Sequence, residues 1–316
     1  MKHDPNHRIA VDITGNDFYP RYLAAKKGID DRSLNHHVQE TLRQALGQVT
    51  DRGPINILEI GAGIGTMVQR ILERGLLKGQ ATYVATDSDP AQLVAAREYL
   101  SRWARKQGHA LSWSGEDRCR LRTPAADVTV VLIPASVEEL AEGSHTLDPF
   151  HLLIAHAVLD LVDFPALLPG LLQRLEQNGL AYLTCNFDGE TVFLPGCDTD
   201  QEIIERYHAS METRLTGASH TGRRLMQFLQ RPEVELLAAG SSDWVIHPCR
   251  AGCCADEIFF LHTIIETVER ELAGKDTPLP GLAAWARQRH RQAEAGELSF
   301  RARHLDLLAR RQSPRP

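Results

Sequence analysis

The sequence predicts an α/β protein, a three-layer sandwich in which helices cover both faces of a mostly parallel sheet. Short apolar runs alternate with helical patterns from residue 55 to about residue 187, and strand–helix units repeated at this length are typical of parallel sheets. Further along, two apolar runs, 234–240 and 243–248, are joined by a tight connection. Strands this close can pair only antiparallel, so we expect a seven-stranded sheet with an antiparallel seventh strand.

The first strand–helix units have the clearest patterns. Residues 55–60 and 81–87 are apolar runs typical of buried strands, and residues 66–77 between them have the apolar spacing of a helix. The next helix begins after Asp89, whose side chain can cap free amides. Pro90 then takes the first helical position, where its missing N–H costs nothing.

The later elements follow the same alternation less regularly. Residues 127–133, 151–159 and 179–187 are apolar runs that predict strands, and residues 165–177 predict a helix. Residues 110–115 fit either an extra strand or one half of a hairpin, and both alternatives stay open.

The segments around this series predict additions to a core domain. The residues after the fifth strand are polar and aperiodic, which is typical of lids and binding loops. The residues after 275 contain a Pro-rich break followed by two expected helices, which offer a surface for a homodimer. We therefore expect an N-terminal helical cap at 1–50, a core domain at 51–274 with a lid insertion at about 187–221, and a C-terminal helical extension at 275–316.

The composition favours a cytoplasmic protein and disfavours a nucleic-acid binder. The chain has 316 residues and a formal net charge of −6, without the basic excess of a dedicated nucleic-acid-binding protein. No apolar run is long enough to cross a membrane, and the N-terminal residues lack a signal-peptide core. The densest cysteine group, Cys249, Cys253 and Cys254, lacks a second ligand pair at zinc-like spacing. We expect reduced cysteines and no metal.

A glycine-rich turn follows the first strand, with Gly61, Gly63 and Gly65 before Thr66. Such turns let a cofactor approach bare backbone. The dinucleotide pattern requires a further glycine or alanine at position 66, and the Gly-Lys-Ser/Thr of phosphate loops does not follow. Both phosphate-binding interpretations are therefore weakened, and a nicotinamide oxidoreductase is disfavoured.

Two carboxylates lie beside this turn. Asp87 ends the second strand, and neighbouring parallel strands bring its carboxylate level with the turn, where it can accept both hydroxyls of a ribose. Glu59, two residues before Gly61, adds negative charge that repels phosphate and attracts an amino group. These residues predict a nucleoside ligand that also carries an amino group.

With these residues in place, the chain resembles the class I S-adenosylmethionine-dependent methyltransferases, of the small-molecule type. The matching motifs are "LEIGAGIGT" (58–66), "VATDSDP" (84–90), "HLLIAHAVLDLVD" (151–163) and "LEQNGLAYLTCNF" (175–187). The strand pair near 234–247 is similar to the last two strands of the family. The resemblance implies a Rossmann-like fold, with S-adenosylmethionine as the methyl donor and S-adenosylhomocysteine as the product.

The resemblance also implies which residues contact the cofactor. The glycine turn passes the methionine part, Asp87 takes the ribose hydroxyls and Ser88 lies beside the adenosine. Ser136 stands where the family often has an acidic residue near the adenine, so this chain departs from the pattern there. The implied cofactor residues, including two from the N-terminal segment that can reach the methionine carboxylate, are Glu59, Gly61, Ala62, Gly63, Gly65, Asp87, Ser88, Ser136, Val137, Ala155, His156, Tyr22 and Arg32.

The methyl acceptor is less constrained than the donor. Methyl transfer from a sulfonium is a direct displacement that requires alignment and exclusion of water, with a general base only if the acceptor must lose a proton. Family members that methylate amino groups of nucleic-acid bases carry Asn/Asp-Pro-Pro-Tyr/Phe after the fourth strand, where this chain has "AHAVLD" (155–160). A small-molecule acceptor is therefore favoured. A protein or RNA acceptor, and a noncatalytic cofactor-binding protein, are the alternatives.

Acceptor-binding residues are expected mainly after the fifth strand, because ligands of open α/β sheets lie beyond the carboxyl ends of the strands. His156 and His208 are the candidate catalytic bases, since imidazole titrates near neutral pH. The candidate acceptor-binding residues are Asn186, Asp188, Tyr207, His208, Arg214 and Arg224.

Overall fold

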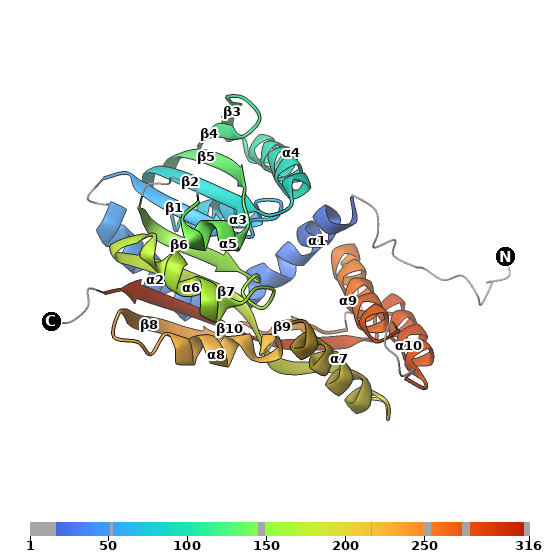
Figure 1. Ribbon diagram of the computed structural model, residues 1–316. Coiled ribbons are helices and arrows are strands. Elements are labelled where there is room, and N and C mark those ends of the chain that lie inside the picture. The colour runs from blue at the N-terminus through green and yellow to red at the C-terminus, as the bar shows by residue number, and fades with distance from the viewer. Residues whose placement is uncertain are drawn as a thin grey trace.

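The computed structural model describes residues 17–50, 53–144, 149–215, 217–248, 254–273 and 279–312. Within these ranges the centre is one sheet of ten strands, in the order β3-β4-β5-β2-β1-β6-β7-β10-β8, with β9 beside β10 (Figure 1). The predicted α/β class is confirmed, but the sheet has more strands than the seven expected. The strands are β1 (Ile55–Ile60), β2 (Gly79–Asp87), β3 (Ala110–Trp113), β4 (Arg118–Arg122), β5 (Ala126–Pro134), β6 (Phe150–His156), β7 (Leu175–Leu194), β8 (Val234–Ser241), β9 (Trp244–Ile246) and β10 (Ser299–Arg311).

Helices pack on both faces of this sheet through separate apolar cores. Leu42, Ile71 and Leu100 belong to the core under α2, α3 and α4, and Leu168 and Leu225 belong to the core under α6 and α8 on the other face. The helices are α1 (Phe18–Ser33), α2 (His36–Thr50), α3 (Thr66–Glu73), α4 (Pro90–Gln107), α5 (Val137–Glu142), α6 (Phe164–Gln173), α7 (Asp200–Arg214), α8 (Thr221–Phe228), α9 (Ala255–Ala273) and α10 (Leu282–Glu294). None of the helices in the described ranges has the combined length and hydropathy of a membrane span.

The parallel part of the sheet, β5-β2-β1-β6-β7, fixes where a ligand can bind. In the register of these strands, Glu59 of β1 lies beside Ala85 of β2 and Ile154 of β6. The carboxyl ends of the three strands therefore meet at one edge, which is where ligands of open α/β sheets bind. At the far side of the sheet, β3 forms an antiparallel hairpin with β4, which settles the alternatives left open for residues 110–115.

The expected C-terminal pair of helices is wrong in its second half. Residues 282–294 form α10, but residues 299–311 form β10, an antiparallel strand inserted between β7 and β8. The side chains alternate, since Phe300, Ala302 and His304 are buried while Arg301 and Arg303 are 42% and 41% exposed. That period of two is the pattern of a strand with one buried face, so residues 275–316 are not a purely helical extension.

The strand pair expected near 234–247 is also arranged differently. β8 and β9 do not form a hairpin with each other. Both pair antiparallel with β10, β8 along residues 305–311 and β9 along residues 300–302, so they follow one another along a single edge. Asp243 holds the break between them, because its carboxylate accepts hydrogen bonds from Ser241 Oγ over 2.5 Å and from Arg301 Nε over 2.8 Å. The antiparallel neighbour of the fifth parallel strand is thus β10.

The expected lid at 187–221 is mostly regular structure. β7 continues to Leu194, and its second half pairs with β10 from Ala302 back to Ser299. A bend separates the halves, with a positive φ of 55° at Cys185 and irregular register opposite residues 302–307 of β10. We call β7 residues 186–194, β9 and β10 residues 299–304 the C-terminal ribbon. It carries a third core with α7, α9 and α10.

Helix α1 joins this ribbon to the parallel sheet. It lies between the carboxyl edge of the sheet and α9 (Figure 1). Ile29 of α1 is fully buried in the third core, while Leu23 reaches the glycine turn after β1. The N-terminal helix therefore covers the edge at which the parallel strands end.

Candidate functional site

The turn between β1 and α3 requires its glycines. Gly61, Gly63 and Gly65 have positive φ angles of 62°, 52° and 77°, a region that other residues rarely adopt. A Cβ on Gly61 would lie 2.7 Å from Val158 Cγ2, and one on Gly63 would lie 2.6 Å from Leu23 Cδ1. The turn is thus packed closely between the segment after β6 and helix α1.

Asp87 lies beside this turn, as the order of the strands predicts. Its Oδ2 accepts a hydrogen bond from the Gly63 amide over 2.8 Å, and its Oδ1 accepts one from the Asp89 amide over 3.0 Å. Burial raises the pKa of this carboxyl, and the two amide donors oppose that effect. Ser88, next to it, is exposed. The carboxylate is therefore fixed at the turn with lone pairs left for further donors.

Glu59 has a different role from the one expected. Its side chain is 2% exposed and accepts a hydrogen bond from the Tyr83 hydroxyl over 2.7 Å. Burial raises its pKa to about 8, although Tyr83 and Arg70 act in the opposite direction. The carboxyl is protonated at neutral pH, so the interpretation of Glu59 as a negative charge that attracts an amino group is corrected. Ala62, in the glycine turn, is buried in the core under α2, α3 and α4.

Ser136 and Val137 lie at the start of α5, after β5. The Ser136 hydroxyl accepts a hydrogen bond from the Glu139 amide over 3.2 Å, and the Glu139 carboxylate accepts one from the Ser136 amide over 2.8 Å. This reciprocal arrangement is a capping box. Val137 is buried in the core with α6, so both residues have structural partners at the edge beside Asp87.

His156, at the end of β6, sits in a buried charged cluster. Its Nδ1 is 2.8 Å from Thr184 Oγ1 and its Nε2 is 3.0 Å from Asp30 Oδ2. Burial lowers its pKa to about 4, so the ring is neutral at pH 7. With both ring nitrogens engaged, His156 holds α1 on the sheet rather than presenting a free base. Its neighbour Ala155 is buried in the core on the opposite face.

The positive and negative side chains of this cluster pair with one another. Lys26 Nζ lies 2.8 and 2.7 Å from the two carboxylate oxygens of Asp30, and Arg70 Nε donates to Asp31 over 2.5 Å. These cations hold the pKa of Asp30 well below its usual range. One ligand atom each of Asp30, His156 and Cys185 lie within 4.8 Å of one another, but Lys26 and Arg70 already supply the positive charge that a metal would bring. Cys249 and Cys253 lie outside the described residues.

The two N-terminal cofactor candidates diverge along α1. Tyr22 faces α9, and its ring stacks on Phe260 with centroids 5.9 Å apart. Arg32 donates to the Val245 carbonyl over 3.1 Å and pairs with Glu257 over 2.5 Å. The guanidinium of Arg32 is therefore occupied at β9 and α9, and the ring of Tyr22 is packed against α9.

The structure disperses most of the candidate acceptor residues. Asn186 Nδ2 donates to the Leu305 carbonyl over 2.9 Å inside the sheet, and Asp188 binds Arg223 Nε over 2.8 Å at the start of α8. Arg224 lies over the Phe164 ring at 5.2 Å. Arg214 pairs with Glu271 over 3.7 Å. These four side chains serve contacts between elements rather than one common site.

His208 and Tyr207, on α7, lie nearer the ribbon. His208 Nε2 is 3.0 Å from Thr191 Oγ1, and burial lowers its pKa. Tyr207 packs against the third core, and burial raises the pKa of its hydroxyl to about 12. The charge of Asp160 adds to this rise in pKa, as it does for the hydroxyls of Tyr22 and Tyr19 of α1.

Asp160 is a residue that sequence reasoning missed. It lies in the turn after β6, two residues beyond Val158, which touches the glycine turn. Its Oδ1 is buried without a hydrogen-bond partner in the part of the chain that the structure describes. The motif "AHAVLD" was available in the sequence, but the burial of the oxygen of its last residue depends on tertiary packing.

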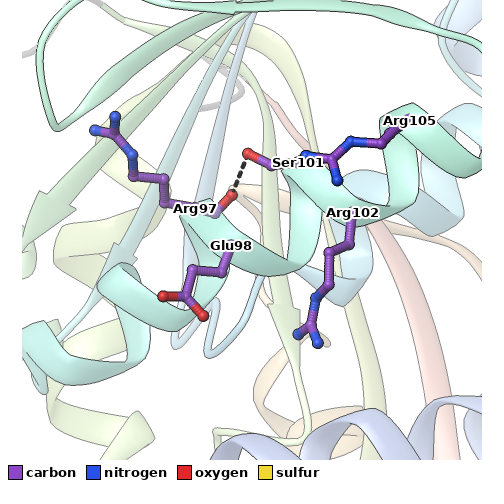
Figure 2. Close-up of a pocket in the computed structure, with 5 residues that line it drawn as sticks. All are labelled: Arg97, Glu98, Ser101, Arg102 and Arg105. Atoms are coloured by element: carbon purple, nitrogen blue, oxygen red, sulfur yellow. Dashed lines mark hydrogen bonds between the residues drawn. The ribbon is translucent and has the colours of Figure 1, made fainter.

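A separate hollow lies on the outer face of α4. It has a volume of about 300 Å³ and is lined by Arg97, Glu98, Ser101, Arg102 and Arg105. Figure 2 shows these side chains along the helix, with Ser101 bonded to the Arg97 carbonyl. They lie on the helix that follows Asp89, and the hollow does not include the glycine turn or Asp87.

A glycine turn at the carboxyl edge of a parallel sheet, with a carboxylate fixed beside it, defines an α/β protein for a nucleoside cofactor. Residues 58–181 match the family model described as a methyltransferase domain. These residues therefore form a methyltransferase domain of the class I, S-adenosylmethionine-dependent type. The chain is accordingly an enzyme with S-adenosylmethionine as its methyl donor. No curated protein sequence matches the chain.

Solved structures resemble the chain at low identity. A Bacillus halodurans C-125 protein, provisionally named a methyltransferase, is 14% identical with a TM-score of 0.45, covering 86% of this chain and 99% of that one. The plantazolicin methyltransferase BpumL, solved with S-adenosylhomocysteine, is 13% identical with a TM-score of 0.44 over 95% and 92%. YjhP from E. coli is 13% identical with a TM-score of 0.44 over 91% and 98%. The functional assignment rests on the family match at residues 58–181.

Proposed function

We propose that the chain transfers the methyl group of S-adenosylmethionine to a small molecule at the edge formed by the ends of β1, β2 and β6. The observation that carries this proposal is the Asp87 carboxylate, fixed beside the glycine turn by the Gly63 amide at 2.8 Å. The turn requires its glycines, because their φ angles are positive and because Val158 and Leu23 leave no room for a Cβ at Gly61 and Gly63. When bound, S-adenosylmethionine supplies an electrophilic methyl group on a sulfonium.

The proposed cofactor residues come from five segments of the chain. Asp87 accepts the ribose hydroxyls, with Ser88 beside the adenosine. Glu59, in its neutral form, lies in β1 just before the turn and accepts a hydrogen bond from Tyr83. The remaining proposed residues, along the turn, at the adenine edge and beside the methionine part, are Gly61, Ala62, Gly63, Gly65, Ser136, Val137, Ala155, His156 and Tyr22.

The cover formed by α1 favours a small acceptor over a polymer. Leu23 of α1 packs against the turn at Gly63, and the buried Lys26–Asp30 pair with His156 holds the helix down. A protein or RNA acceptor would have to displace this helix and expose the buried charges. An enclosed site also excludes water, which a reactive methyl donor requires.

Neither candidate histidine is placed as a free general base. Both nitrogens of His156 have partners, and the Nε2 of His208 is 3.0 Å from Thr191. We assign His156 to positioning α1 and His208 to the contact between α7 and the ribbon. An acceptor with a free lone pair needs no base, because the displacement proceeds by direct attack on the methyl carbon.

Calorimetry with S-adenosylhomocysteine tests the cofactor assignment. We expect wild type to bind S-adenosylhomocysteine and not NAD, and Asp87→Ala to lose about 2 to 4 kcal/mol of binding free energy, since two hydrogen bonds to a carboxylate are removed. Asp163→Ala, an exposed carboxylate at the start of α6, is the matched control and should bind like wild type. Binding of NAD without S-adenosylhomocysteine would contradict the assignment.

A further inference from the structure

Two histidines meet between α9 and α10, which pack side by side (Figure 1). The Nδ1 of His262 in α9 lies 2.6 Å from the Nδ1 of His290 in α10, and the two ring centroids are 4.9 Å apart. His262 is 5% exposed, so the contact is sheltered from water. One of the two nitrogens donates and the other accepts. This contact fixes the ring of His290 and leaves its Nε2 on the side away from His262.

Two carboxylates of α9 approach the same ring. Glu266 Oε2 is 3.4 Å from His290 Nε2, and one ligand atom each of Glu266, Glu269 and His290 lie within 4.8 Å of one another. His262, Glu266 and Glu269 are spaced four and three residues apart, which places them along one face of the helix. In the described part of the chain, Glu266 pairs with His290 and not with a lysine or arginine. The cluster around Asp30, by contrast, contains its own cations.

The two helices that carry these side chains are fixed by the third core. Ile265 and Val268, which flank Glu266 in α9, are fully buried, as is Arg289 next to His290 in α10. The side chains of His290 and Glu266 are 18% and 23% exposed, so an ion can reach them from solvent. A site that is formed before its ligand binds loses little entropy on binding.

The donor atoms suit a zinc ion. Imidazole nitrogen and carboxylate oxygen are both ligands of Zn²⁺, with bonds of about 2.0 to 2.2 Å, and a tetrahedral ion then needs its ligand atoms about 3.3 to 3.6 Å apart. The distance of 3.4 Å between His290 and Glu266 lies in this range, and rotation of the Glu269 side chain can bring in its carboxylate. A histidine that binds a metal usually has its other nitrogen held by a second polar group, which here is His262.

We propose that Glu266, Glu269 and His290 bind a divalent transition metal ion, Zn²⁺, which joins α9 to α10, with water as the fourth ligand. His262 positions the ring of His290. It accepts the Nδ1 hydrogen of His290, so the Nε2 lone pair of His290 faces the ion. The site uses none of the cysteines on which the expectation of no metal rested. It is also independent of the proposed methyl transfer.

Calorimetry with Zn²⁺ tests the site on the 316-residue chain, prepared without an affinity tag and freed of metal with EDTA. We expect wild type to bind one Zn²⁺ per chain. Glu266→Gln, Glu269→Gln and His290→Gln should each bind at least about a hundredfold more weakly, because each removes a ligand. Glu98→Gln and His37→Gln, at exposed positions of α4 and α2, are the matched controls and should bind like wild type. No binding by wild type, or only weak binding that all variants share, would overturn the proposal.

Two further variants separate this site from other sources of zinc affinity. His262→Phe keeps a ring but removes the partner of the His290 nitrogen, and should bind about ten- to a hundredfold more weakly. Unchanged affinity would contradict the positioning role of His262. The group Cys249, Cys253 and Cys254 offers thiolate ligands, and its triple serine variant should bind Zn²⁺ like wild type. Loss of binding in the serine variant, with binding retained in Glu266→Gln, would assign the ion to the cysteines and overturn the proposal.

Thermal unfolding separates loss of the site from loss of the fold. With EDTA, Glu266→Gln and His290→Gln should unfold close to the wild-type temperature, because both positions are partly exposed. Zn²⁺ should raise the unfolding temperature of wild type, since it binds the folded chain, and should not raise that of either variant. An equal rise in wild type and Glu266→Gln would overturn the proposal. If His290→Gln does not fold, the two glutamine variants of α9 decide the result.

Discussion

The amide of Gly63 donates a hydrogen bond to the carboxylate of Asp87 over 2.8 Å. Gly63 lies in the turn after β1 and Asp87 ends β2, and the parallel pairing of these two strands brings them together. This contact fixes both the direction of the carboxylate and the path of the glycine turn. A ligand that binds Asp87 therefore meets the turn in one geometry.

The first prediction concerns the turn itself. Gly63→Ala should destabilise the protein by about 1 to 2 kcal/mol, because the position has a positive φ that costs this much for a residue with a Cβ, and Leu23 Cδ1 adds a contact at 2.6 Å. Urea unfolding measures the change. In the double variant with Leu23→Ala the contact is gone, so the additional cost of Gly63→Ala should be smaller. An equal cost with and without Leu23 would show that α1 does not press on the turn.

The second prediction concerns the charged cluster under α1. Arg70 is 1% exposed and binds Asp31, so Arg70→Met leaves Asp30 and Asp31 with less positive charge around them. Removing one partner of a buried pair costs about 3 to 5 kcal/mol. Urea unfolding should show a loss of this order, with earlier proteolysis near residues 18–33. Arg102→Met, an exposed arginine of α4, is the control and should change stability little. A similar small effect for Arg70→Met would refute the role of the cluster.

The third prediction concerns the strand character of the C-terminus. Ala302 is 4% exposed, whereas the next residue, Arg303, is 41% exposed and pairs with Glu190 over 2.8 Å. Ala302→Asp should cost more than about 3 kcal/mol, because it buries an unpaired charge. Arg303→Asp should cost about 1 kcal/mol or less, as expected for a surface pair. Thermal and urea unfolding measure the loss of stability. Comparable losses at the two positions would contradict the alternation of buried and exposed side chains along β10.

The fourth prediction concerns pH. Burial lowers the pKa of His304 to about 4, and an unfolded histidine titrates near 6.5. Between these values the unfolded state binds the extra proton and the folded state resists it, so stability falls as pH drops from about 6.5 to 4. His304→Phe, which keeps a ring beside Trp244 at 4.1 Å, should reduce the loss measured between pH 7 and pH 5. His37→Gln, at an exposed position, should leave it unchanged. An undiminished loss in His304→Phe would exclude His304 as its source.

Local patterns determined the parallel half of the fold because neighbouring residues decide such elements. The run 55–60, the glycines at 61, 63 and 65 and the cap at Asp89 each specify structure through their own backbone preferences. Asp89 indeed accepts the Ala91 amide over 2.9 Å at the start of α4. Asp87 could be placed at the turn because consecutive parallel strands share their register.

The C-terminal half was harder because its signals depend on distant partners. Residues 299–311 are rich in arginine and leucine, which also suit a helix, and only pairing with β7 and β8 makes them a strand. Asn186, Asp188 and Arg224 have the chemistry of ligand-binding residues, yet their partners are a carbonyl, an arginine and an aromatic ring within the protein.

The sequence by itself indicated the methyl donor through a family resemblance, since the glycine turn, Asp87 and the later motifs follow one another along the chain in the order of that family. Tertiary structure alone decided that Glu59 is a neutral, buried carboxyl, that His156 has both nitrogens occupied, and that Asp160 Oδ1 is buried without a hydrogen-bond partner among the described residues. Burial and long-range pairing decide which groups are protonated and which polar atoms lack a hydrogen-bond partner. Neither property follows from the order of neighbouring residues.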